Sequence, residues 1–149
     1  MKYFMISLTK VEILDHVSLN STYMGAKAGD DSGFFERVRT IEDDDPLLSR
    51  FWIEMCGVLT DQLKEFTTSS SDQADILTLN FEVSGAFDES LVPSIKEDLF
   101  AAMAAGITAR WFAYTLPDKS EEWNSQSRSM LARAVSKLCH RRRPSRPSQ

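Results

Sequence analysis

The sequence predicts a mainly helical protein: a small helical bundle with one or two short β-strands and extended termini. Three long segments, near residues 45–66, 91–116 and 118–138, repeat apolar residues at spacings of three and four, the period of an amphipathic helix. Only two short segments have the character of strands. The 149 residues, of which 42% are hydrophobic and 26% charged, suffice for one domain with one core.

The N-terminal part of the chain predicts a short strand followed by helical turns. Residues 2–7 (KYFMIS) favour a strand, and residues 9–12 (TKVE) form a capping box, in which Thr and Glu satisfy backbone groups at the start of a helix. Residues 20–28 indicate a further helical turn with Tyr23 as its anchor. The expected buried face of the first helix consists of Val11, Leu14 and Val17. A small apolar cluster follows at Phe34, Phe35 and Val38.

The strongest helical signal begins at Asp45, which can cap a helix, and Pro46 suits the first turn. Apolar residues then recur over about 20 residues with the helical period. They are Leu47, Leu48, Phe51, Trp52, Met55, Leu59, Leu63 and Phe66. Gly57 interrupts this pattern, and we expect a close helix crossing there. Residues 67–72 (TTSSSD) predict a polar break.

Residues 76–83 (ILTLNFEV) alternate apolar and polar side chains, which predicts a strand with one buried and one wet face. A single strand is not stable alone, so it needs a partner. The sequence leaves three partners open: the N-terminal strand, a further short strand, or a strand of another subunit.

Two more helices complete the predicted bundle. Asp88 or Ser90 can cap the first, which carries Pro93 in its first turn, ends before Pro117 and is apolar on most of its circumference. We therefore expect it to be central, and its run of small residues at 101–106 (AAMAAG) predicts that another element packs closely there. Residues 118–121 (DKSE) form a second capping box, and the last helix has one apolar face: Trp123, Ser127, Met130, Leu131, Ala134 and Leu138. The predicted core consists of Phe51, Trp52, Met55, Leu59, Leu99, Met103, Trp111, Met130, Leu131 and Leu138.

Charge is distributed unevenly along the chain. The net charge is −5, but residues 1–127 carry 10 basic and 22 acidic side chains, whereas residues 128–149 carry seven basic and no acidic ones. A basic tail on an acidic body suits an acidic partner, although such a run can also serve only as a solubilising tail. No aromatic residue is interleaved in the tail, which disfavours stacking on bases. The predicted partner-binding residues are Lys137, Arg141, Arg142, Arg143 and Arg146.

The residues predict neither an enzyme nor a metal or cofactor site. The two histidines, His16 and His140, and the two cysteines, Cys56 and Cys139, have no zinc-ligand spacing, and Cys56 fits a core thiol. Glycine-rich phosphate loops and nucleophile elbows are absent from the sequence. The acidic run at 30–45 lacks the spacing of a calcium-binding loop. No apolar run approaches the roughly 20 residues of a membrane span, and the N-terminus does not look like a secretory signal.

The order of these elements resembles the small head-to-tail connector (adaptor) proteins of tailed bacteriophages. Three aspartates, a proline and two leucines at 43–48 (DDDPLL) lead into the first long helix. Residues 92–96 (VPSIK) begin the central helix, and residues 109–114 (ARWFAY) end it. The similarity covers about residues 40–143 in order and type of elements. We expect one helical domain over residues 1–143, with the connector-like core at about 40–143, and a basic extended tail at 144–149.

The resemblance implies a structural virion protein without enzymatic activity or cofactor. It implies a homo-oligomeric ring, commonly of twelve subunits, in the neck of the virion, assembled in the cytoplasm of the bacterial host. Its partners would be the portal protein, tail or neck proteins, and DNA that passes through the lumen without sequence-specific contact, with no membrane involved. The alternatives are a small nucleic-acid-binding accessory protein that uses the basic tail, a small regulatory or toxin–antitoxin-type helical protein, and an enzyme. The acidic body argues against a broad DNA-binding face.

Overall fold

The structure, a computed structural model, describes residues 1–28 and 45–144. Within these ranges it contains four α-helices and one three-stranded antiparallel sheet, which confirms the predicted mainly helical class. The helices are α1 (Lys10–Ala28), α3 (Asp45–Gln62), α4 (Val92–Thr115) and α5 (Pro117–Leu138). The strands are β1 (Lys2–Thr9), β2 (Thr67–Ser71) and β3 (Ile76–Val83). Arg146, the apolar cluster at 34–38 and all of the acidic run except Asp45 lie outside the described residues.

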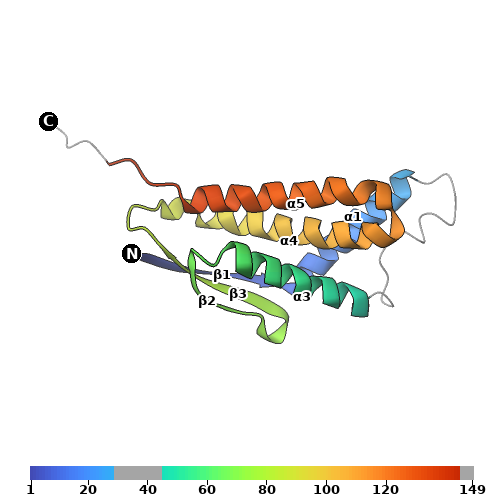
Figure 1. The fold of residues 1–149 in the computed structure, drawn as a ribbon, viewed down its shortest axis with the longest axis horizontal. Coiled ribbons are helices and arrows are strands. Elements are labelled where there is room, and N and C mark those ends of the chain that lie inside the picture. The colour runs from blue at the N-terminus through green and yellow to red at the C-terminus, as the bar shows by residue number, and fades with distance from the viewer. Residues whose placement is uncertain (29–44, 145–149) are drawn as a thin grey trace.

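The sheet has the order β1-β3-β2, so the predicted strand at 76–83 is its central strand (Figure 1). β1 pairs with it over its full length, from Lys2 opposite Val83 to Thr9 opposite Ile76. β2 pairs along the other edge, with a bulge between Thr67 and Ser69. The expectation of a polar break at 67–72 was therefore wrong. An edge strand obtains its hydrogen bonds from its neighbour, so an exposed hydroxyl-rich segment can form one without an apolar face of its own.

One face of the sheet supports the helices. Leu77, Leu79, Phe81 and Val83 of β3 are buried, while the intervening Thr78, Asn80 and Glu82 point to the wet face, as the alternating pattern predicts. α4 and α5 lie side by side along the length of the molecule (Figure 1). α4 also contacts α1 and α3, and its residues 102–109 are all buried, so it is the central helix.

The predicted core is confirmed apart from one residue, whereas the predicted buried face of the first helix needs correction. Nine of its ten residues are buried, and Met130 is half-buried. α1 is one continuous helix in which Val11 is 62% exposed and so forms no part of the buried face, and the Tyr23 side chain is also 62% exposed. Its buried face is Ile13, Val17 and Ser21. The predicted face and the observed face both include Val17 and have the spacing of a helix. Packing against α4 determines which of the two faces is buried.

Two predictions about the ends and crossings of helices were also wrong. A Cβ at Gly57 would meet nothing within 4 Å, so the close helix crossing is elsewhere, at Gly106 of α4. α5 begins at Pro117 without a side-chain cap, so residues 118–121 do not act as a capping box. Ser120 lies inside the helix, and its hydroxyl donates instead to the carbonyl of Ala109, at 2.9 Å.

Candidate functional site: a cationic notch

The first residues of the basic segment after α5 fold back onto the body of the protein. Arg141 forms an isolated antiparallel bridge with Phe87, and the backbone N–H of Arg142 donates to the carbonyl of Ala86 at 2.7 Å. Residues 84–87 are the turn that follows β3. Because these contacts use only backbone atoms, the side chains of Arg141, Arg142 and Arg143 all stay exposed.

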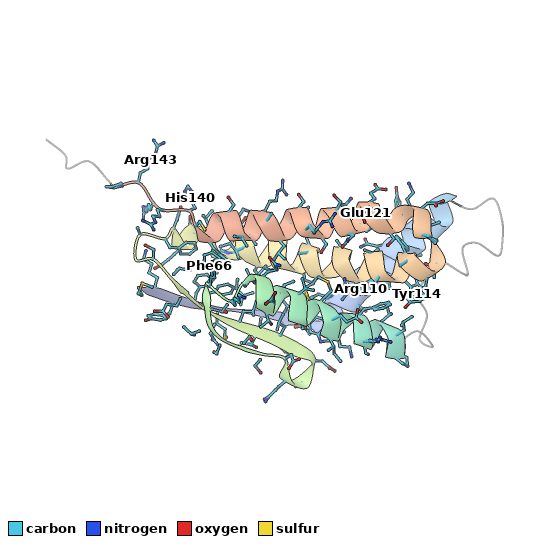
Figure 2. The ribbon with its side chains drawn as sticks, viewed as in Figure 1. Phe66, Arg110, Tyr114, Glu121, His140 and Arg143 are labelled. Carbon is cyan, nitrogen blue, oxygen red and sulfur yellow. The ribbon has the colours of Figure 1, made fainter. Side chains whose placement is uncertain are left out.

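Lys2, at the start of β1, lies beside these arginines although it is 140 residues away in the chain. Its Nζ donates to the carbonyl of Phe87 at 3.0 Å and lies 3.4 Å from Oε1 of Glu89. Lys2, Gly85, Ala86, Arg142 and Arg143 together line a depression of about 370 Å³. We call this depression the cationic notch, because its only charged lining residues are a lysine and two arginines. Arg143 and His140 mark this end of the molecule in Figure 2.

The structure does not bring all five predicted partner-binding residues together. Lys137 belongs to the interface between α4 and α5, where its Nζ lies 2.6 Å from Oδ2 of Asp98 and 2.6 Å from Oγ of Ser94. Its charge is therefore used inside the bundle. Arg142 and Arg143 line the notch, while Arg141 lies next to it in the chain. Sequence reasoning missed Lys2, because no local pattern links the start of β1 to the end of α5.

The acidic residues at the rim of the notch have partners of their own. The hydroxyl of Ser90 donates to Oδ1 of Asp88 at 2.7 Å, and the backbone N–H of Ser90 donates to the same atom at 3.1 Å. These two hydrogen bonds, with a smaller contribution from Arg142 and His140, hold the pKa of Asp88 below its usual value. Glu89 pairs with Lys2. The two guanidinium groups remain available for carboxylate or phosphate oxygens, which they can bind in a bidentate manner.

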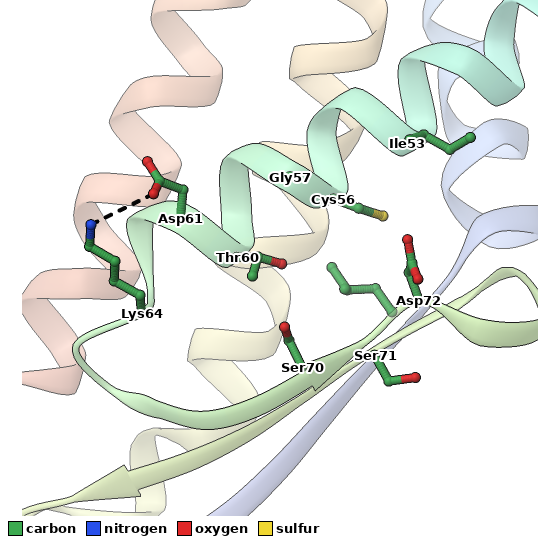
Figure 3. Close-up of a pocket in the computed structure, with 10 residues that line it drawn as sticks. Ile53, Cys56, Gly57, Thr60, Asp61, Lys64, Ser70, Ser71 and Asp72 are labelled. Atoms are coloured by element: carbon green, nitrogen blue, oxygen red, sulfur yellow. Dashed lines mark ion pairs between the residues drawn. The ribbon is translucent and has the colours of Figure 1, made fainter.

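A second depression, between α3 and β2, holds no activated nucleophile (Figure 3). Cys56 is buried there, and burial raises the pKa of its thiol to about 12, with a further contribution from the negative charge of Asp72. The thiol is neutral at neutral pH and therefore a poor nucleophile. Asp61 and Lys64 at the rim form an ion pair with each other at 3.7 Å. Cys56 is thus a core residue, as its helical position indicates.

The described parts of the chain contain no group of three or more His, Cys, Asp or Glu side chains placed to hold a metal ion. None of the helices described is both long and apolar enough to cross a membrane. No protein-family model, curated protein or solved structure matches this chain. The resemblance to phage connectors therefore stays a prediction from the order of the elements.

Proposed function

We propose that this chain is a structural subunit of the neck of a tailed phage, where it forms a ring between the portal and the tail. The observation that carries the proposal is the cationic notch. Both ends of the described chain contribute to it, and backbone contacts to the 84–87 turn hold Arg142 in place. It lies on a protein whose first 127 residues are strongly acidic. Such a surface suits docking onto an acidic neighbour and needs no cofactor.

An acidic protein surface fits the notch better than a nucleic acid does. The lining residues include no aromatic side chain on which a base could stack. The notch is also small, whereas proteins that bind a duplex present a broad basic face.

Co-sedimentation of the purified full-length chain tests this function. The chain is mixed separately with rings of the portal protein from the same phage genome and with a short DNA duplex, each at low and moderate salt. We expect it to sediment with the portal at both salt concentrations and to leave the duplex unbound. Binding to the duplex without binding to the portal would overturn the proposal in favour of a nucleic-acid-binding accessory protein.

A further inference from the structure

We infer that the cationic notch binds the acidic run at residues 42–45 (EDDD) of a second copy of this chain. This inference rests on the proposed function and deepens it, because it names the neighbour that the notch contacts. Each subunit would then offer one notch and one acidic run. The same contact, repeated from copy to copy, would build the assembly.

The arginines of the notch bind no carboxylate of the described residues directly, although the charge of Arg142 acts on nearby Asp88. Among the described residues, neither Arg142 nor Arg143 has a side-chain ion pair. Lys2 alone has an acidic partner, Glu89, whose side chain is 68% exposed. An exposed pair of this kind is weak and can be exchanged for a stronger contact. Two guanidinium groups and one ammonium group thus face a space that contains no carboxylate of its own lining.

Asp45, at the end of the acidic run, lies at the opposite end of the molecule from the notch. α3 begins at Asp45, and its early residue Phe51 stacks on Tyr114 near the end of α4, with ring centroids 6.1 Å apart. Figure 2 shows Tyr114 and Arg143 toward opposite ends of the molecule. The 18 residues of α3 span about 27 Å along that axis. Asp45, the described residue of the acidic run, therefore lies far from the notch of its own chain.

The proposed contact also has a definite symmetry. A notch at one end that binds an acidic run from the other end makes a heterologous contact, in which the two surfaces differ. Such contacts close into a ring when the rotation between neighbours permits, and otherwise extend as a filament. Four consecutive carboxylates in the sequence complement three cationic side chains, and the planar fork of arginine binds carboxylates bidentately. Charge complementarity of this kind determines partner and register.

A charge-swap experiment tests the inference, with the mass of the purified full-length chain in solution as the readout. One variant carries Arg142→Glu and Arg143→Glu, and a second carries Asp43→Arg and Asp44→Arg. Each alone should lose self-association, with an association constant at least about tenfold lower than that of the unmodified chain. A mixture of the two should assemble again, because each altered surface then meets its complement. A chain with all four substitutions should also assemble, which shows that the altered chains are folded.

The matched control is Lys96→Glu with Arg133→Glu, which changes the net charge equally at exposed positions on α4 and α5. It should associate like the unmodified chain. A labelled peptide of residues 40–47 (TIEDDDPL) supplies a direct probe. It should bind the unmodified chain, lose binding to the Arg142→Glu, Arg143→Glu variant, and dissociate as salt is raised.

Three results would overturn the inference: an unmodified chain that stays monomeric at all concentrations, self-association that survives reversal of both arginines, or swapped variants that do not assemble when mixed. A duplex that binds the notch when the peptide does not would overturn it as well. Failure of the proposed function is distinguishable. A chain that self-associates through the notch but ignores the portal contradicts the neck function alone. A chain that binds the portal but is unaffected by the swaps contradicts the self-contact alone.

Discussion

Gly57 and Gly106 both lie inside helices, yet their surroundings are opposite. A Cβ at Gly57 would meet open space, whereas a Cβ at Gly106 would lie 2.5 Å from the terminal atoms of Met55 and 3.0 Å from Oγ of Ser127. That hydroxyl cannot move freely, because it donates to the carbonyl of Ala102 at 2.7 Å. Met55 belongs to α3 and Ser127 to α5, so the absent side chain at Gly106 is what lets three helices meet.

Alanine at the two glycines should therefore change stability in opposite directions. Gly57→Ala should raise the free energy of unfolding by about 0.5–1 kcal/mol, because alanine loses less backbone entropy in a helix and meets no neighbour here. Gly106→Ala should lower it by about 1–3 kcal/mol, because Met55 must leave its packed position. Urea denaturation of both variants measures the difference. A Gly106→Ala protein as stable as the unmodified chain would show that Met55 moves aside at no cost.

α4 and α5 are joined by a polar contact as well as by apolar packing. Asp98 of α4 is only 8% exposed, and a carboxylate so deeply buried needs a partner. Lys137 supplies the charge at 2.6 Å, and the same ammonium group reaches Ser94. Lys137 thus locks the last turn of α5 onto the first turns of α4 and takes no part in the notch.

Lys137→Met should lower the free energy of unfolding by about 1–3 kcal/mol, because it leaves the Asp98 carboxylate without its cation. Adding Asp98→Asn to this variant should recover part of the loss, since the uncompensated charge is then removed. Lys119→Met is the matched control on the same helix. Its ion pair with Glu122 is exposed and 3.7 Å long, so the change should stay within about 0.5 kcal/mol. Equal losses for the two lysines would contradict a special contribution of the buried pair.

β3 should be the best protected strand of the isolated chain. It has partners on both edges, β1 and β2, so its backbone amides do not need a neighbouring subunit to form hydrogen bonds. Hydrogen exchange at Leu77–Val83 should be slow even at concentrations where the protein is monomeric. Exchange that becomes slow only on assembly would indicate that the pairing forms between chains. The free edges for strand addition, if the assembly uses one, are the outer edges of β1 and β2.

Both ends of the described chain meet at one end of the whole molecule. β1 starts there, the turn after β3 passes there, and the segment after α5 returns to that turn (Figure 1). The sequence suggests that everything after Leu138 is dispensable for folding, since the segment has almost no apolar content. The backbone contacts of Arg141 and Arg142 predict a small but measurable contribution instead.

Two truncated chains separate these views. A chain that ends at Leu138 should lose about 1 kcal/mol of unfolding free energy, the size of one or two lost hydrogen bonds. A chain that ends at Pro144 keeps the contacts to Ala86 and Phe87, so its stability should equal that of the full-length protein. Thermal and urea unfolding of both chains give the comparison. Equal stability of the two would mean that the contacts at 86–87 contribute nothing.

Local patterns predicted α3, α4, α5 and β3, because a helix or strand that covers a core must repeat its apolar residues with its own period. They also predicted nine of the ten core residues correctly and the central position of α4. The distribution of charge along the sequence alone indicated the basic segment after α5. These features depend on residues close to each other in the chain, so a sequence reading can reach them.

Tertiary structure alone decided the rest. β2 has no apolar signal, because its place comes from backbone pairing with β3. The buried face of α1 depends on which of two phases meets α4. The run of small residues at 101–106 predicts close packing there, but that the neighbours are Met55 and Ser127 follows only from the fold. The notch exists only because folding places Lys2 beside Arg142 and Arg143. Contacts between residues far apart in the chain leave no periodic pattern in any one segment. Only the fold brings these side chains together.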